Sequence, residues 1–252
     1  MTPDTLRLRQ ICLVAPALEP AADELGTILG LPICHRDPRV GVFGVENVLF
    51  VAGTTFIEII APLRPDTAAA RFLDRSNGQG GYIAIFDCAD PHGRERAANA
   101  IGVATAYKID RQRDYTAVQL HPRDCRATML EFDRTEGGDD LTGRYSPAGP
   151  GWQQHADTRI TRGITAIGAI SPQPTDLAAH WAAILQRPVE ADGLSIAIDG
   201  ATIGFEAGGG SERLDWIGID AADPAAIMAE ARKRGRDSGP HSFVSSGMTF
   251  RL

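Results

Sequence analysis

Charged residues close four similar stretches of this sequence, and the first two of these residues are carboxylates. Glu58 lies in the apolar run FIEII and Glu131 in MLEFD, each near the end of an expected strand. Gln10 and Tyr82 lie in the strands that open the same two stretches, at nearly equal distances from the closing glutamates. A carboxylate in a partly dry environment can take or give a proton near neutral pH. These four positions are the first candidates for chemistry.

The matching positions of the third and fourth stretches have a different character. They hold Ala166 with Glu206 and Trp216 with Arg251, at shorter spacings. An alanine, an indole and a guanidinium cannot chelate a cation, whereas Glu206 and Arg251 can form an ion pair. We expect the second half of the chain to be structural or to recognise an anion.

The elements that position these residues recur in the same order. Each stretch opens with a short apolar strand that runs into a turn marked by proline, and an Ala-rich helix and two or three strands follow. The opening segments are Gln10–Pro16, Gly81–Pro91, Ile164–Pro174 and Asp215–Pro224. A repeat of several tens of residues dictates the architecture. We therefore predict an α+β fold of four tandem βαβββ modules, paired into two domains.

Local signals support this order of elements. Asp90 and Asp223 each precede a proline, which is typical of a helix N-cap followed by the first helical position. After the first helix, strands are expected over residues 40–45, 47–52 and 54–60. Gly53, Gly200 and Gly247 mark hairpin turns.

The composition changes between the two halves. Gly, Asp and Pro dominate between residues 134 and 159, and the apolar periodicity is lost. This predicts a domain over residues 5–133 that carries the candidate site, a linker over 134–159, and a second, trimmed domain over 160–252.

Bulk composition excludes several classes of protein. The 252 residues are 43% hydrophobic with a net charge of −7, and no basic stripe appears, which argues against nucleic acid or an anionic membrane as the main partner. The first residues show no secretion signal, and no apolar run approaches the ~20 residues of a membrane span. The four scattered cysteines are typical of reduced thiols. We expect a cytoplasmic protein.

In these modules the chain resembles the vicinal oxygen chelate superfamily of glyoxalase-like and bleomycin-resistance-like proteins. The matching segments are RQICLVAP…LGTILGLP with FGVENVLFVAGTTFIEIIAP, and GGYIAIFDCADPHG…IGV with VQLHPRDCRATMLEFD. The resemblance is good over residues 5–133 and weaker over 160–252. It implies two modules that form a cup, with metal ligands from their opening and closing strands. The bound divalent ion would stabilise an enolate-like intermediate.

The resemblance places Gln10, Glu58, Tyr82 and Glu131 at the four ligand positions. Tyr82 stands where a histidine is expected, so the site lacks the imidazole that suits Zn, Ni or Fe(II). Gln10, Glu58 and Glu131 can still hold a hard cation with water. We expect either no cofactor or a weakly held Mg or Mn ion.

The implied activity is lyase or isomerase chemistry on a small oxygenated molecule. In that case Glu58 or Glu131 abstracts a proton next to a carbonyl, Tyr82 donates a hydrogen bond to the oxyanion, and Gln10 orients substrate or metal. His121, at a strand end before a proline, is a further acid–base candidate, and its alternative role is to stabilise a turn.

Two other functions fit the same sequence, because a fold does not determine a function. One is a metal-free module that sequesters a small molecule, as in resistance proteins of this type. The other is a degenerate scaffold whose main role is to oligomerise. For the enzyme and for the sequestering module, the expected partner is a small molecule. The sequence leaves open whether the protein forms a homodimer.

Overall fold

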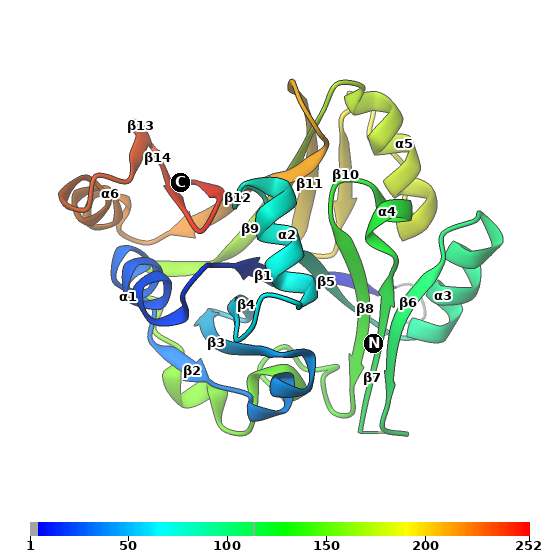
Figure 1. The fold of residues 1–252 in the computed structure, drawn as a ribbon, viewed down its shortest axis with the longest axis horizontal. Coiled ribbons are helices and arrows are strands. Elements are labelled where there is room, and N and C mark those ends of the chain that lie inside the picture. The colour runs from blue at the N-terminus through cyan, green and yellow to red at the C-terminus, as the bar shows by residue number, and fades with distance from the viewer. Residues whose placement is uncertain (1–4, 113) are drawn as a thin grey trace. The chain divides into compact units, whose positions relative to one another are not determined.

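The computed structural model describes residues 5–112 and 114–252 (Figure 1). The first four residues, to which the expectation about a secretion signal applies, lie outside this range. Strands β1–β8 belong to one sheet and β9–β15 to another. The fold is α+β and consists of four tandem modules, as the sequence predicts; the first, second and fourth are βαβββ units, and the third has one strand fewer, βαββ.

By their internal contacts the residues form two compact units, and each unit contains segments from both halves of the sequence. Unit A consists of the residues up to Arg9, Ile83–Ser146 and Ala166–Leu214. Unit B consists of Gln10–Tyr82, Pro147–Thr165 and Asp215–Leu252. Strands β1, β9 and β12 therefore contribute residues to both units.

Unit A contains the second and third modules. Its elements are β5 (Ile83–Cys88), α3 (Pro91–Ala100), β6 (Thr105–Asp110), β7 (Tyr115–Leu120), α4 (Pro122–Cys125), β8 (Met129–Thr135), most of β9 (Thr161–Ser171), α5 (Pro174–Leu185), β10 (Ser195–Ile198) and β11 (Ala201–Ala207). Strands β5, β8, β7 and β6 are neighbours in this order (Figure 1). The opening strand β5 is parallel to the closing strand β8, and β9 is likewise parallel to β11.

Unit B contains the first and fourth modules. Its elements are most of β1 (Leu6–Val14), α1 (Leu18–Leu29), β2 (Ile33–His35), the 3₁₀ helix η1 (Pro38–Phe43), β3 (Val45–Ala52), β4 (Thr55–Pro62), α2 (Ala68–Ser76), η3 (Trp152–His155), most of β12 (Arg213–Ala221), α6 (Pro224–Lys233), β13 (Asp237–Gly239), β14 (Ser242–Ser245) and β15 (Met248–Arg251). Here too the opening strands are parallel to the closing ones, β1 to β4 and β12 to β15. The short 3₁₀ helix η2 (Ser146–Ala148) lies where the chain passes from unit A to unit B.

Helices from distant modules pack together within each unit. In unit A, Trp181 of α5 is fully buried, packs edge-on against Phe205 and donates from its indole nitrogen to the carbonyl of Cys125 at 2.9 Å. In unit B, α1 contacts α6, and Asp23 accepts from Arg234 at 2.9 Å (Figure 1). Burial of these apolar faces stabilises each unit at roughly 25 cal/mol for each Å² removed from water.

The structure differs from the sequence prediction at two places. Residues 38–43 form η1 instead of a strand, because Asp37 caps the turn, Pro38 fixes its first position and Gly44 ends it at a φ of 71°. Helix α2 was not expected from the sequence. Its N-cap is Thr67, whose hydroxyl accepts from the backbone N–H of Ala70 at 3.1 Å.

The segment between the two halves of the sequence carries buried aromatic residues. Tyr145 in unit A and Trp152 in unit B are each 2% exposed. Trp152 packs edge-on against Phe56, with ring centroids 5.1 Å apart. The segment is therefore anchored to the cores that it connects.

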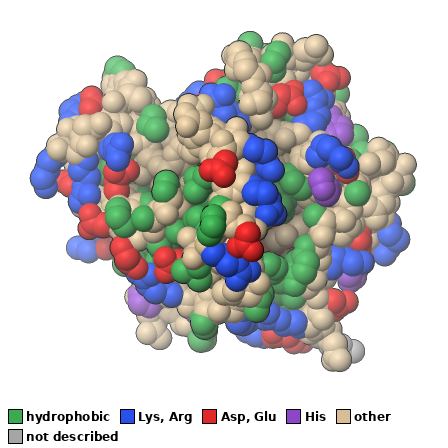
Figure 2. All heavy atoms as spheres, viewed as in Figure 1, with side chains coloured by type: hydrophobic (Ala, Val, Ile, Leu, Met, Phe, Trp, Pro, Cys, Tyr) green, Lys and Arg blue, Asp and Glu red, His purple; other side chains and the backbone are tan. Residues whose placement is uncertain are grey.

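The surface mixes charges of both signs. Figure 2 shows basic and acidic side chains interspersed with apolar ones over the face in view. No helix in the described part of the chain has the length and apolar character needed to cross a membrane.

Candidate functional site

Gln10 and Glu58 lie together in unit B. The register of the parallel strands pairs Cys12 with Glu58, which leaves Gln10 two residues away on the same face of the sheet. The side-chain amide of Gln10 donates from Nε2 to Oε2 of Glu58 at 2.9 Å. Both side chains are buried, at 2% and 8% exposure. The sequence analysis identified this pair.

Asn47 of β3 completes the cluster, and the sequence analysis missed it. Its Nδ2 donates to Oε1 of Glu58 at 2.7 Å, and its Oδ1 accepts from the backbone N–H of Asp37 at 2.8 Å. An asparagine in the run VENVLFVA is a signal that could have been used, because a buried amide needs hydrogen-bond partners. Each oxygen of Glu58 thus accepts from a neutral amide.

A groove of about 320 Å³ opens over Asn47. Apolar side chains of Leu18, Val45 and Leu63 contribute to its lining, and Glu46 lies at the same groove. Leu63 is exposed although it is apolar. The groove therefore connects solvent to a residue that binds Glu58 directly.

Tyr82 also belongs to unit B, directly before β5. Its backbone N–H donates to the carbonyl of Cys12 at 2.9 Å, and its ring packs edge-on against Phe72 of α2 at 5.1 Å. Burial raises the pKa of Tyr82 to about 12. The hydroxyl therefore stays protonated at neutral pH and is available as a hydrogen-bond donor.

Strand register gives a sharper correspondence between the first two modules. Glu131 pairs with Ile85, as Glu58 pairs with Cys12. The residue that corresponds to Gln10, two positions before the paired residue, is therefore Ile83 and not its neighbour Tyr82. An isoleucine side chain offers no ligand or hydrogen-bonding atom.

Glu131 lies in unit A beside a second carboxyl, that of Asp133. The two residues are two positions apart in β8, so their side chains lie on the same face of the sheet. Gln119 of the neighbouring strand β7 pairs in register with Glu131 and donates from Nε2 to Oε2 of Glu131 at 2.6 Å. The hydroxyl of Tyr115 donates to Oδ2 of Asp133 at 2.6 Å. The sequence analysis did not single out Asp133, although its alternation with Glu131 in MLEFD was visible.

Two arginines at the start of β1 interact with Asp87 and Tyr145 in the same unit. Asp87 pairs in register with Asp133 and forms an ion pair with Arg7 at 2.6 Å. Arg9 is 1% exposed and stacks on the ring of Tyr145, 5.0 Å from the ring centroid. Charges of both signs are therefore buried together, which is favourable only when they compensate one another.

Burial changes the proton affinity of both carboxyls. It raises the pKa of Glu131 above its ordinary value, while hydrogen bonds from Asp133 and Gln119 oppose the rise. Burial also raises the pKa of Asp133 well above its ordinary value, and the adjacent charge of Glu131 raises it further. This pair is suited to hold a proton at a pH at which ordinary carboxyls are ionised.

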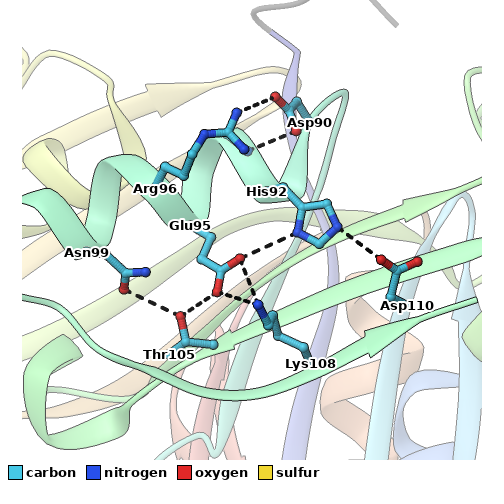
Figure 3. Close-up of polar contacts among 9 residues, drawn as sticks. Asp90, His92, Glu95, Arg96, Asn99, Thr105, Lys108 and Asp110 are labelled. Carbon is cyan, nitrogen blue, oxygen red and sulfur yellow. Dashed lines mark hydrogen bonds and ion pairs between the residues drawn. The ribbon is translucent and has the colours of Figure 1, made fainter. Parts of the chain in front are cut away.

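Glu95, the second buried glutamate of unit A, has its pKa shifted in the opposite direction to that of Glu131. Glu95 of α3 accepts from the hydroxyl of Thr105 at 2.8 Å and lies 3.1 Å from the ammonium of Lys108 and 3.4 Å from His92 (Figure 3). These partners lower the pKa of Glu95 against the effect of burial. Glu95 is therefore a matched comparison for Glu131.

His121 caps a short helix in unit A. Its Nδ1 accepts from the backbone N–H of Arg123 at 3.3 Å, and its own backbone N–H donates to Ala104. This contact matches the turn-stabilising alternative. The structure places His121 and Glu131 in unit A and the other candidates in unit B, so their assembly on one concave surface stays a prediction.

The closing positions of the third and fourth modules lie in different units. In unit B the guanidinium of Arg251 stacks on the indole of Trp216, 4.3 Å from its centroid. Glu206 belongs to unit A, where it pairs in register with Ile170. An ion pair between Glu206 and Arg251 also stays a prediction.

The donor set does not fit a tightly held metal. Both oxygens of Glu58 already accept from amide N–H groups, so a cation would compete with these hydrogen bonds. Ile83 stands at the position that would supply the next ligand. In residues 5–112 and 114–252, no group of three His, Cys, Asp or Glu residues is placed to hold a metal ion.

Comparison with known proteins supports the fold. No family model and no curated protein matches the sequence. A structure of a hypothetical protein from Staphylococcus aureus covers 98% of this chain and 98% of its own, with 13% identity and a TM-score of 0.65. Methylmalonyl-CoA epimerase in complex with methylmalonyl-CoA and NH4+ covers 52% of this chain and 94% of its own, with 20% identity and a TM-score of 0.46. The corresponding epimerase from Mycobacterium tuberculosis covers 51% of this chain and 87% of its own, with 20% identity and a TM-score of 0.45.

The tandem modules, three of them βαβββ and one βαββ, each with parallel opening and closing strands, define a vicinal oxygen chelate, or glyoxalase-like, fold. This confirms the resemblance seen in the sequence at the level of the fold. The Staphylococcus aureus structure shows that the same arrangement extends over a whole chain of similar architecture. The epimerase matches span about half of this chain, and no conclusion about substrate follows from them.

Proposed function

We propose that this protein is a glyoxalase-like enzyme that moves a proton at a carbon next to a carbonyl group of a small oxygenated molecule. The reaction class is lyase or isomerase chemistry through an enolate-like intermediate. The observation that carries this proposal is the buried Glu131–Asp133 carboxyl pair: both residues lie on one face of β8, and burial raises the pKa of each carboxyl above its ordinary value.

Glu131 is a better candidate base than Glu58. Each oxygen of Glu58 already accepts from an amide, so its role is to anchor Asn47 and Gln10. Glu131 instead contacts Gln119, which is only half-buried, and therefore has a neighbour that reaches toward solvent. In this mechanism Glu131 takes the proton, and the electron pair of the broken C–H bond moves to the carbonyl oxygen.

The protonated hydroxyl of Tyr82, in unit B, is the proposed hydrogen-bond donor to a substrate oxygen in that unit. Gln10 of the same unit is the proposed orienting group. Gln10 and Glu58 could hold a Mg or Mn ion only weakly, with water as further ligands, and no step above depends on it.

Proton exchange tests this function directly. Small 2-oxo acids, 2-hydroxy ketones and acyl thioesters are incubated with the protein in heavy water, and loss of the α-proton signal is followed by NMR. For a compound that exchanges, we expect Glu131→Gln to lower the rate by roughly 10²-fold or more, because the base is lost. Glu95→Gln is the control and should retain the wild-type rate. Unchanged exchange in Glu131→Gln would refute the assignment of Glu131 as base.

The groove over Asn47 favours a second function, binding of a small molecule without catalysis. The same set of compounds separates the two functions. A compound that raises the melting temperature of the protein but never exchanges its α-proton supports binding alone.

A further inference from the structure

The groove over Asn47 lies within unit B and has largely apolar walls. Leu18 of α1, Val45 of β3 and Leu63 after β4 contribute to its lining. Its volume of about 320 Å³ lies at the lower end of the range of roughly 300–1,000 Å³ that is typical of small-molecule sites. A small apolar body is therefore stabilised by entering the groove, because its surface and the walls are both removed from water.

The 3₁₀ helix η1 adds exposed apolar residues beside the groove. Val42 and Phe43 are exposed, and they follow Gly41, which lines the groove. Leu63 in the groove wall is exposed as well. Exposed apolar side chains that gather at one place mark a binding surface more often than side chains that are scattered singly.

Two of the polar side chains at the groove are already engaged. Both amide atoms of Asn47 are used, Nδ2 by Glu58 and Oδ1 by the backbone N–H of Asp37. The guanidinium of Arg36 donates to both carboxylate oxygens of Glu19, at 2.9 and 3.1 Å. A ligand therefore gains little from the Asn47 amide, and the charge of Arg36 is compensated.

One negative charge at the groove is left uncompensated. The carboxylate of Asp37 forms an ion pair with Arg39 at 2.8 Å. Arg64, which follows the apolar wall in sequence, is paired with Asp66 at 2.9 Å. Glu46 lines the groove and is exposed, and no cation in the described part of the chain forms an ion pair with it. A ligand that brings one positive charge complements Glu46.

We propose that this groove binds a small molecule with an apolar body and one positive charge, such as a primary amine. The apolar body lies against Leu18, Val45 and Leu63, and the ammonium group pairs with Glu46. This inference rests on the binding function proposed above and names its class of ligand. It does not depend on proton transfer at Glu131.

Three compounds of nearly equal size test the charge preference in the full-length protein at pH 7. They are 3-phenylpropylamine as the cation, 3-phenylpropanol as the neutral compound and 3-phenylpropionate as the anion. Titrations are followed by backbone amide shifts in ¹H–¹⁵N NMR spectra, and the shifted signals should belong to residues 36–47, Leu18 and Leu63. We expect the amine to bind about three- to fivefold more tightly than the alcohol, as for an exposed ion pair, and the anion to bind most weakly. Added salt should reduce this preference.

Two variants separate the charge from the apolar wall. Glu46→Gln should lower the affinity for the amine to that for the alcohol, whose own affinity should not change. Leu63→Ser should weaken all three compounds by a similar factor of roughly three, because it removes apolar surface and no charge. Glu136→Gln is the matched control, since Glu136 is an exposed glutamate of unit A and its loss changes the net charge equally.

Several results would overturn the inference. They are binding of the anion as tightly as the amine, an amine preference that survives in Glu46→Gln or is lost equally in Glu136→Gln, shifted signals away from the groove, and no binding by any of the three compounds. Tighter binding of the alcohol than of the amine at the groove would refute the ligand class and keep the binding function. The proton exchange assigned to Glu131 is measured separately, so its failure leaves the groove unaffected.

Discussion

Glu58 and Glu131 occupy matching positions of the first two modules but have different hydrogen-bond partners. Glu58 accepts from the amides of Gln10 and Asn47, and Glu131 accepts from the amide of Gln119 and lies beside Asp133 on the same face of β8. The difference arises from β8, where Asp133 follows Glu131 on the same face; the corresponding residue of β4 is Ile60. The two modules therefore differ beside the matching glutamate, where β4 has an isoleucine and β8 has a second carboxyl.

Asp133→Asn should change how stability depends on pH. The pKa of Asp133 lies well above its ordinary value of 3.8, so the folded protein binds more protons than the unfolded chain above that pH. This contribution to stability is fully present below pH 3.8 and is lost as the pH rises toward the folded-state pKa. We expect the free energy of unfolding in urea to fall less steeply with rising pH in the variant than in the wild type. Parallel curves for the two proteins would contradict the raised pKa.

Asn47→Ala should destabilise the protein by about 1–3 kcal/mol, because it leaves an oxygen of Glu58 and the backbone N–H of Asp37 without their partner. Asn99→Ala is the control. Asn99 is exposed and makes a long contact of 3.4 Å with Thr105 (Figure 3), so its loss should cost about 0.5 kcal/mol or less. Urea unfolding of both variants measures the difference, and equal effects would show that Asn47 is not a structural link to Glu58.

The residues of the candidate site were only partly predictable. Gln10, Glu58 and Glu131 were recognisable because a charged or amide group in an apolar strand recurs with the module. Asn47 and Asp133 were missed because their importance lies in pairs across strands, and register is not visible from one strand alone. Tyr82 was aligned one position from Ile83 for the same reason.

At the scale of elements, the sequence signals that correctly predicted structure were the residues that set backbone geometry at helix ends. Asp90 and Asp223 cap their helices as predicted, with side chains that accept from the third following N–H at 2.9 Å. The failure at η1 arose because the β-branched residues between Pro38 and Val45 favour a strand by composition. The Asp-Pro cap and the glycine turn outweighed that preference.

Gly53 and Gly200 allow a test of two hairpin turns that share a backbone conformation. Both have positive φ, 61° and 82°, so alanine is strained at either position. A Cβ at Gly53 would also collide with the backbone carbonyl of Arg162, whereas at Gly200 it would meet nothing within 4 Å. We expect Gly53→Ala to lower the free energy of unfolding by about 1–3 kcal/mol more than Gly200→Ala. Similar losses would show that the β3–β4 turn does not pack against Arg162.

At the scale of the whole molecule, the grouping into units was not predictable from local patterns. Repetition predicts four modules, but which modules share a core depends on the faces that their helices present to one another. In unit A, Arg94 of α3 donates to the backbone carbonyl of Leu185 at the end of α5. In unit B, the hydroxyl of Thr161 donates to the carbonyl of Leu29 at 2.7 Å. Each of these bonds joins one half of the sequence to the other.

Cleavage of the chain between its halves should therefore leave them associated. A protease site inserted between Ala156 and Asp157 lies in an exposed, irregular segment, where insertions are tolerated. After complete cleavage we expect both fragments to elute together in size-exclusion chromatography, because units A and B each need segments from both sides of the cut. They should separate only in denaturant. Elution as two folded, independent fragments would show that the halves are self-sufficient domains, with boundaries near residues 133 and 160 and no shared core.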